Sequence, residues 1–355
     1  MLGAFNFITN KIPKFMLKEL FRKIPPYKIN TIKNMRSFKS VLIDCHTIIC
    51  PLLPEDMILM DEEVVLKKII ASIKCSERLG VKIATLGGFT SVVGNEGEAV
   101  SRRAGIAVTS GNTYTAALAI EGIIKAAYCM DLDLSSATLA VIGATGDIGS
   151  ICTKILSRKV KKLNLIARDE ARLAVFADTI RCDSNIEVCF CKLNRDAIKD
   201  ADIVLTVTSA ISAIIDPQSL KSGAIVCDVA IPANIARAVA GARDDVFVFE
   251  GGLAKLPYQN EIKDRVFNNL MPSGSVYGCL AEGAVLTFEG KFENYSIGRG
   301  NITESKVKEV AGIAKKHGFQ LADFFSGHRF YSEEDILTIR RNAKRNSLDG
   351  AIIGR

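Results

Sequence analysis

The stretch that decides the fold of this chain is Thr138-Leu139-Ala140-Val141-Ile142-Gly143-Ala144-Thr145-Gly146-Asp147-Ile148-Gly149. A short apolar run ends in three glycines spaced three residues apart, and a helix over residues 147–158 is expected to begin inside the turn. Such a turn gives a tight exit from a strand, a close backbone approach to a pyrophosphate and close packing of helix on sheet. The stretch therefore predicts a βαβ unit that binds a dinucleotide, with residues 143–149 as its phosphate-binding turn.

Strand-length and helix-length segments alternate around this turn. Further strands are expected at residues 162–167, 186–190, 203–207, 224–228 and 246–249, with a helix at 169–180. Strand, crossover helix and parallel strand in succession give a doubly wound sheet. Helices are also expected at residues 62–79, 112–130, 277–288 and 303–317. The predicted fold class is α/β, with a Rossmann-like domain at 131–252 inserted in an α/β substrate and catalytic domain formed by 41–130 and 253–330.

The end of the second predicted strand indicates which dinucleotide fits. An acidic residue there would bind the ribose 2′-hydroxyl of NAD, but this chain has Arg168, with Arg172 one helical turn later. A guanidinium suits a 2′-phosphate through its charge and paired hydrogen bonds, so NADPH is the expected cofactor. Asp169 is expected to cap the following helix. The nicotinamide half of the site is expected to be lined by residues after later strands: Thr208, Ser209, Ala210, Ala230 and Gly252.

Composition limits the class of protein. The 355 residues are 48% hydrophobic and 24% charged, which is typical of a soluble globular protein of about two domains. No apolar stretch reaches the roughly 18 residues needed to cross a bilayer, and the N-terminus lacks the features of a secretion signal. The ten cysteines show no paired spacing, which favours a reducing compartment. A cytoplasmic protein is expected.

The first 40 residues differ from the rest of the chain in charge. Residues 1–40 hold nine basic residues and one acidic residue, a net charge of +8, whereas the whole chain carries +7. Two interpretations of this basic amphipathic arm remain open: a solvated cover of the domain, or a docking element for an anionic membrane surface or an acidic protein. No nucleic-acid motif accompanies the charge. At the other end, Ser332 is expected to cap a surface helix, within 331–355, that has no chemical role.

Cys279 is the candidate nucleophile. A loop containing glycine and serine delivers it to the start of an apolar helix, and a helix N-terminus stabilises a thiolate, which attacks acyl carbons well. Glu282, one turn later, could orient a group, exchange a proton or cap the helix. The alternative for Cys279 is a buried small apolar residue. The other cysteines and the three histidines show no zinc-ligand or triad spacing, so no metal site is expected.

The chain resembles the long-chain acyl-[acyl carrier protein] reductases, best known from cyanobacteria. The resemblance covers roughly residues 40–320 and is carried by short segments in the same order: 86–91, 110–115, 141–150, 167–168, 250–252, 279–282, 288–290, 298–303 and 316–319. It implies that Cys279 accepts the acyl group from a carrier protein or coenzyme A thioester, and that NADPH reduces this acyl-enzyme to a fatty aldehyde. Unlike this chain, the family lacks the basic arm and the terminal helix.

The remaining site residues follow from this mechanism. The oxyanion of the intermediate needs donors, for which the side chains of Asn112 and Thr113 are ranked first, before those of Thr90 or Ser91 and backbone N–H groups near Cys279. The acyl chain or pantetheine is expected along Gly87, Gly88, Phe89, Thr90 and Ser91, and beside Tyr114, where the family commonly has histidine.

Three other functions use some of the same features. A shikimate-dehydrogenase-like oxidoreductase shares the fold but depends on a Lys–Asp pair that has no counterpart in the first domain. A reductase of coenzyme A, aminoacyl or polyketide thioesters would use the same chemistry. A non-catalytic NADP(H) sensor would need only the nucleotide turn.

Overall fold

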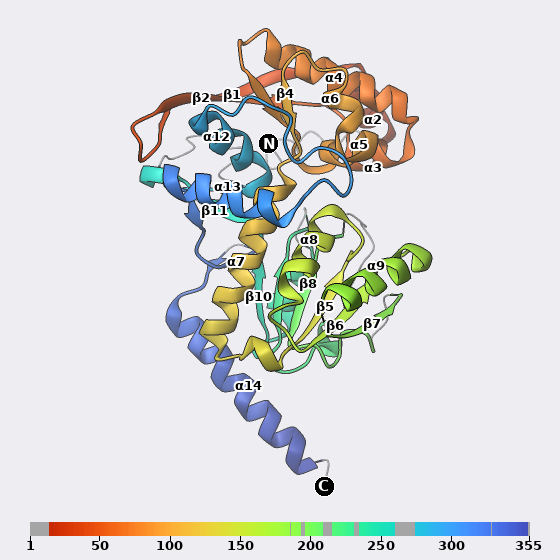
Figure 1. Ribbon diagram of the computed structural model, residues 1–355, viewed down its shortest axis with the longest axis vertical. Coiled ribbons are helices and arrows are strands. Elements are labelled where there is room, and N and C mark those ends of the chain that lie inside the picture. The colour runs from red at the N-terminus through yellow and green to blue at the C-terminus, as the bar shows by residue number, and fades with distance from the viewer. Residues whose placement is uncertain are drawn as a thin grey trace. The chain divides into compact units, whose positions relative to one another are not determined.

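The computed structural model describes residues 14–184, 186–192, 196–208, 215–230, 234–259, 274–327 and 329–353. The chain divides into two compact units, and each is built from separate parts of the sequence. The first unit comprises Met1–Tyr114, Ala254–Asn301 and Lys308–Gln320, and the second comprises Thr115–Leu253, Ile302–Val307 and Leu321–Arg355. The elements of both are labelled in Figure 1. Among the described residues, no helix combines the length and apolar character needed to cross a bilayer.

The second unit contains a six-stranded sheet in the order β10-β9-β8-β5-β6-β7. Every neighbouring pair is parallel. This is the 3-2-1-4-5-6 order of a dinucleotide-binding Rossmann fold, with the first strand in the middle. The strands are β5 (Thr138–Ile142), β6 (Lys162–Ile166), β7 (Glu187–Cys191), β8 (Ile203–Thr206), β9 (Ile225–Asp228) and β10 (Phe247–Glu250). The α/β fold class and the parallel Rossmann-like sheet predicted from the sequence are confirmed.

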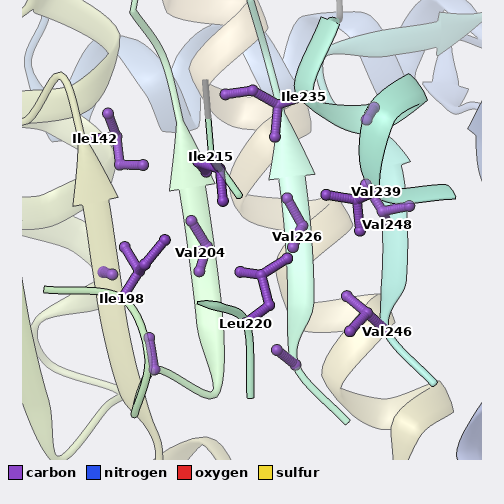
Figure 2. Packing of buried hydrophobic residues seen from close by; sticks show 14 of the residues in the cluster. Ile142, Ile198, Val204, Ile215, Leu220, Val226, Ile235, Val239, Val246 and Val248 are labelled. Carbon is purple, nitrogen blue, oxygen red and sulfur yellow. The ribbon is translucent and has the colours of Figure 1, made fainter. Parts of the chain in front are cut away.

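Both faces of this sheet are covered, which explains why its strands are apolar at nearly every position. On one face Ile142, Val204, Val226 and Val248 follow one another across the strands and meet α10 (Asn234–Ala242), as Figure 2 shows. The residues between them, such as Leu139, Leu205 and Phe247, are also fully buried. The other helices of this unit are most of α7 (Asn112–Met130), α8 (Asp147–Leu156), α9 (Glu170–Asp183) and α14 (Glu333–Ile353).

The first unit combines short strands and helices around its own core. Helix α4 (Glu62–Glu77) packs Val65, Leu66, Ile69 and Ile73 against the parallel pair β3 (Ile83–Thr85) and β4 (Ala107–Thr109). The remaining helices and strands are α2 (Lys14–Lys23), β1 (Tyr27–Arg36), β2 (Leu42–Ile49), α3 (Pro54–Leu59), η1 (Gly88–Ser91), α5 (Val93–Glu96), α6 (Glu98–Ser101), β12 (Ser275–Tyr277) and α12 (Gly278–Glu289). Besides α7, three described elements continue across the boundary between units: α13 (Glu304–His317), β11 (Leu253–Lys255) and β13 (Gln320–Leu321).

The two chain ends are attached more closely than the sequence suggested. Strand β1 pairs antiparallel with β2, so the second half of the basic arm is part of the first unit. Helix α2 is held at its C-terminus, where Lys68 Nζ donates to the carbonyl oxygens of Arg22 and Ile24 at 2.8 and 2.5 Å. In the second unit, α14 buries Ile336, Ile339 and Ala343. Ser332 caps α14 as expected: its Oγ accepts from the Asp335 N–H at 3.1 Å.

Candidate functional site

The first unit places Cys279 in the first turn of α12, whose N-cap residue, Tyr277, makes no side-chain cap hydrogen bond. The side chain of Cys279 is half-buried. Helix α12 begins directly after strand β12, and it packs so closely on β3 that a Cβ on Gly283 would lie 2.1 Å from Thr85 Oγ1. The position of the thiol is therefore fixed by a strand end and by tight packing between helix and strand.

The pKa of the Cys279 thiol differs from the sequence-based expectation. Burial raises this pKa to about 11, and the nearby Glu282 carboxylate raises it further, while backbone hydrogen bonds from Gly88 and Leu280 oppose the rise. The lowered pKa expected from the helix N-terminus is wrong, because desolvation of the thiolate outweighs these backbone dipoles. Cys279 is therefore a protonated thiol at neutral pH in the free protein.

The turn before α7 lies directly against the backbone of Cys279. A Cβ placed on Gly111 would lie 2.2 Å from the carbonyl oxygen of Cys279 and 2.3 Å from its Cα, so only glycine fits. Gly111 also has a φ of +74°, which other residues rarely adopt. The contact brings two segments together that are far apart in sequence, and it places Asn112 next in the chain to the residue that touches the candidate nucleophile.

The N-terminus of α7 is capped entirely by side chains. The N–H groups of Gly111 and Asn112 donate to Thr109 Oγ1 and Ser110 Oγ at 3.3 and 3.4 Å. The next two N–H groups donate to residues of the later chain segment: Thr113 to Ser296 Oγ at 3.3 Å and Tyr114 to Glu282 Oε2 at 2.7 Å. All four N–H groups at this end are thus satisfied within the protein.

Glu282 is at the centre of this cap. Its side chain is fully buried and accepts hydrogen bonds from the hydroxyl groups of Thr109 and Ser296 as well as from the Tyr114 N–H. Burial raises the pKa of Glu282, and these hydrogen bonds oppose the rise. The residue caps α7 rather than its own helix, which is a role that the sequence did not indicate. Ser296 is also fully buried, and its φ of +52° is unusual for a residue other than glycine.

These contacts narrow the choice of oxyanion donors. Thr113 Oγ1 hydrogen-bonds Ser296 Oγ, Thr90 Oγ1 donates to Gly87 O at 2.8 Å, and Ser91 Oγ donates to Gly88 O at 2.8 Å. Asn112 is 8% exposed, and its carboxamide makes no hydrogen bond with the part of the chain that the structure describes. Of the side-chain donors considered from the sequence, only the Asn112 carboxamide has no hydrogen-bond partner among the described residues. The backbone N–H of Leu280, next to Cys279, hydrogen-bonds the Cys279 thiol in the free protein.

The expected substrate segment, residues 87–91, comprises the 3-10 helix η1 and its N-cap residue Gly87, and it lies beside α12 in the first unit. A Cβ on Gly87 would lie 3.0 Å from Leu280 Cδ2, and Gly88 has a φ of +57°. Gly88 is exposed and Phe89 is half-buried. Tyr114, in contrast, is only 3% exposed and its ring packs edge-on against Phe319, 6.5 Å away. The structure thus brings η1 to Cys279, and it gives Tyr114 a place in the core.

The nucleotide turn lies in the second unit and has the geometry of a phosphate-binding site. Gly143 has a φ of +90°, and its N–H and that of Ala144 donate to Ile166 O at 2.8 and 3.1 Å. A Cβ on Gly149 would lie 2.2 Å from Gly143 O, so a side chain there would break the turn. The N-cap of α8 is Gly146, which has no side chain to accept from the first-turn N–H groups. These features fit a bound pyrophosphate.

Other predicted cofactor residues lie at the carboxyl edge of the same sheet. Within the turn, Thr145 and Ile148 are half-buried and Asp147 is buried. Arg168 and Arg172 are exposed after β6 and form no ion pair with the described residues, while Asp169 Oδ1 caps α9 by accepting from the Arg172 N–H at 3.0 Å. Thr208 and Ala230 follow β8 and β9, and Gly252 (φ +75°) follows β10. Ser209 and Ala210 lie outside the described residues.

A buried polar row at this edge was not found by sequence reasoning. Thr206, Asp228 and Glu250 are in register at the ends of β8, β9 and β10, and they are 0%, 1% and 7% exposed. Asp228 accepts from the N–H groups of Ala230 and Ala236 at 3.1 and 2.9 Å. Burial raises the pKa of Asp228 to about 6, against the effect of these hydrogen bonds.

The α7 cap contains the other residues that the sequence did not identify. Thr109 and Ser110 directly precede the helix, so their capping role could have been recognised from residue type and position. Ser296 has no such signal, because 186 residues separate it from Ser110, whose Oγ donates to its carbonyl oxygen.

Comparison with known proteins agrees with this division of the chain. Residues 125–250 match the family described as Shikimate / quinate 5-dehydrogenase. Over 313 residues the chain is 28% identical to the long-chain acyl-[acyl-carrier-protein] reductase of Synechococcus elongatus. The aligned region covers 85% of this chain and 89% of that protein. It is 26% identical to the aminotransferase PigE of Serratia over 82% of this chain but only 34% of that protein.

A shorter match is glutamyl-tRNA reductase of Cyanophora paradoxa, 24% identical over 57% of this chain and 46% of that protein. Among solved structures, shikimate 5-dehydrogenase of Listeria monocytogenes gives a TM-score of 0.31 at 16% identity, over 37% of this chain and 51% of that chain. The chain is thus similar along most of its length to a long-chain acyl-[acyl-carrier-protein] reductase, and its second unit is a Rossmann-like NAD(P)-binding domain of the oxidoreductase type.

Proposed function

We propose that the protein is an NADPH-dependent acyl-thioester reductase that forms a fatty aldehyde through an acyl-enzyme on Cys279. The observation that carries the proposal is the contact of Cys279 with Gly111, at the start of a helix whose N-cap makes no side-chain bond. The backbone of Gly88, an exposed residue, hydrogen-bonds the sulfur of Cys279. A cysteine with only a structural role would not need such an exposed glycine beside its sulfur. The similarity to a long-chain acyl-[acyl-carrier-protein] reductase over 85% of the chain supports the same assignment.

The first step is a thioester exchange. Cys279 Sγ attacks the acyl carbon, the bond from that carbon to the carrier sulfur breaks, and the thiol proton passes to the departing pantetheine thiolate. Because the free thiol has a raised pKa, this proton must leave as the new bond forms. The Asn112 carboxamide and the backbone N–H groups beside Cys279 stabilise the oxyanion during attack. Glu282 acts as a positioning residue, because its carboxylate fixes the start of α7 behind the reacting cysteine.

The second step regenerates the thiol. Residues 143–149 would hold NADPH, with Arg168 and Arg172 at its 2′-phosphate, and the bound cofactor would supply the hydride that reduces the acyl carbon. The same donors stabilise the second oxyanion, which then takes up a proton from solvent. Release of the aldehyde breaks the bond between carbon and Cys279 Sγ and returns the cysteine to its thiol form. Acyl-enzyme, hydride and one proton thus give aldehyde and free enzyme.

The match of residues 125–250 to a shikimate and quinate dehydrogenase family supports a second candidate, an oxidoreductase of small polar substrates. That match lies before α12 and therefore does not include Cys279. A thioester reductase is favoured because its reaction would involve Cys279 and the residues around it, whereas the reaction of a shikimate-type dehydrogenase would not.

The test is intact-protein mass spectrometry after incubation with acyl carrier protein thioesters of several chain lengths, without NADPH. We expect an acyl mass increment on Cys279, lost in Cys279→Ala and discharged as aldehyde when NADPH is added. Acyl-coenzyme A in a parallel arm identifies the preferred donor. No adduct with any donor, or full aldehyde production by Cys279→Ala, would contradict the covalent mechanism. Binding of NADPH without turnover of any thioester would indicate a sensor.

A further inference from the structure

The turn between β1 and β2 exposes apolar side chains within a strongly basic segment. Phe38, Val41 and Leu42 are 48%, 37% and 57% exposed, and Tyr258, which packs against Phe38, is 56% exposed. We call these four side chains the hairpin-turn patch. Between Glu19 and Asp44 the chain has six basic residues and no acidic one: Arg22, Lys23, Lys28, Lys33, Arg36 and Lys39.

The patch is held in a fixed conformation by its own turn. Ser37 is fully buried, its Oγ accepts from the N–H groups of Lys39 and Val41 at 3.2 and 3.3 Å, and Ser40 has a φ of +61°. The Phe38 N–H donates to His317 O at 3.1 Å. Because the turn is tied at several points, the apolar side chains are presented to solvent by a defined backbone.

Contacts of the aromatic rings also hold the patch in place. The rings of Phe38 and Tyr258 meet edge to face, with centroids 4.9 Å apart, and the Arg36 guanidinium lies 5.6 Å from the Tyr258 ring centroid. A Cβ on Gly318 would lie 2.5 Å from the Phe38 ring, so the absence of a side chain there lets the ring lie against the backbone. One side of Phe38 is therefore anchored while about half of its surface faces water.

We infer that the hairpin-turn patch inserts into the interface of an anionic membrane. Burial of aliphatic side chains such as Val41 and Leu42 is favourable because it removes apolar surface from water. Aromatic rings suit the interfacial region of a membrane, and basic side chains can extend to lipid phosphates. An acidic protein would use the positive charge but would also need a pocket for the exposed apolar side chains. Exposed apolar side chains on a turn held by several hydrogen bonds, within a segment of net positive charge, favour a lipid surface. This inference does not depend on the proposed reaction.

The chain contains no tryptophan, which makes a direct test available. In the full-length protein, Leu42→Trp gives a single fluorescent reporter, to be titrated with vesicles of phosphatidylcholine alone and of phosphatidylcholine with about one quarter phosphatidylglycerol. We expect the emission to shift to shorter wavelength with the anionic vesicles only, and the shift to weaken as salt rises. Val175→Trp, at a residue 69% exposed on α9, is the matched control and is expected not to respond.

Co-sedimentation of unlabelled protein with the same vesicles separates charge from insertion. Arg36→Gln with Lys39→Gln is expected to weaken binding about 25-fold, since each basic residue near an anionic surface contributes about fivefold. Leu42→Ser alone is expected to weaken it several-fold, whereas Lys159→Gln with Lys161→Gln, an exposed basic pair of the second unit, is expected to have little effect. Unchanged emission of Leu42→Trp, or equal loss from both charge pairs, would overturn the proposal. Salt-sensitive binding to an acidic carrier protein without vesicle binding would overturn it in favour of a protein partner.

Discussion

The backbone of Gly111 lies against the backbone of Cys279, so that a Cβ at position 111 would meet the Cys279 carbonyl oxygen at 2.2 Å. The two residues belong to separate chain segments, and the contact joins the start of α7 to the start of α12 within the first unit. Next to this contact, Glu282 and Ser296 accept hydrogen bonds from the N–H groups of Tyr114 and Thr113 in the first turn of α7. Cys279 and the polar network around Glu282 therefore belong to one closely packed part of the first unit.

Gly111→Ala tests this contact. We expect the rate of Cys279 acylation to fall by about 100-fold, because the new Cβ must displace the nucleophile by a large fraction of an ångström. Gly290→Ala is the matched control: Gly290 has the same φ of +74°, but a Cβ there meets nothing within 4 Å. Acylation is measured by intact mass at fixed times, and thermal unfolding of both variants separates backbone strain from displacement. Equal losses in the two variants would show that the contact does not matter.

Ser296→Ala tests the cap of α7. The substitution removes the hydroxyl that donates to Glu282 and accepts from the Thr113 N–H, so the free energy of unfolding is expected to fall by about 1–3 kcal/mol. If the cap positions the site, kcat falls while KM for the acyl donor changes little. Ser296→Thr keeps the hydroxyl and should recover more of kcat than of stability, since a β-branched residue suits the φ of +52° poorly. If Ser296→Thr recovered the stability but not kcat, the result would argue against a positioning role for the α7 cap.

The raised pKa of Cys279 predicts the pH dependence of its alkylation. Below the pKa of about 11, the thiolate fraction grows tenfold for each pH unit, so alkylation by iodoacetamide should rise with unit slope from neutral pH to about pH 10. The measurement is peptide mass spectrometry of the segment containing Cys279, which separates it from the other nine cysteines. A plateau near neutral pH would show that the helix terminus prevails over burial.

Asp228 predicts a pH dependence of stability. Its pKa is about 6 in the folded protein and 3.8 when unfolded, so the native state binds the proton more tightly and stability falls as pH rises through this window. The loss reaches about 3 kcal/mol at neutral pH. Urea unfolding of wild type and Asp228→Asn at several pH values should show this loss in the wild type only. Asp245, whose pKa Arg243 lowers, should show the opposite sign: its stabilisation is lost as pH falls.

Arg168→Ala tests the choice of dinucleotide. If Arg168 binds the 2′-phosphate as proposed, removing its guanidinium should raise the Kd of NADPH about 10-fold or more and leave that of NADH nearly unchanged. The binding constants are measured by nucleotide fluorescence in the absence of an acyl donor. Lys161→Ala, an exposed basic residue elsewhere on this unit, controls for general charge. Equal weakening of both nucleotides would place Arg168 away from the 2′ position.

The sequence by itself determined the six-stranded sheet of the second unit. Each strand predicted from a short apolar run is present within about two residues of its expected bounds, because local hydrophobic pattern and glycine spacing act over a few residues. The turn at residues 143–149 was identified for the same reason: the conformation of Gly143 and the tight packing at Gly149 are local demands on residue type.

Only the tertiary structure decided the surroundings of Cys279. A helix N-terminus predicts a lowered thiol pKa, but the sign depends on burial, which is set by segments distant in the chain. Glu282 caps α7 rather than exchanging protons freely, and Ser296 completes that cap across 183 residues from Thr113. Local sequence specifies helices and strands, whereas the polarity and protonation of a site depend on which of them pack against one another. In this protein the deciding contact is that between Gly111, at the start of α7, and Cys279, at the start of α12.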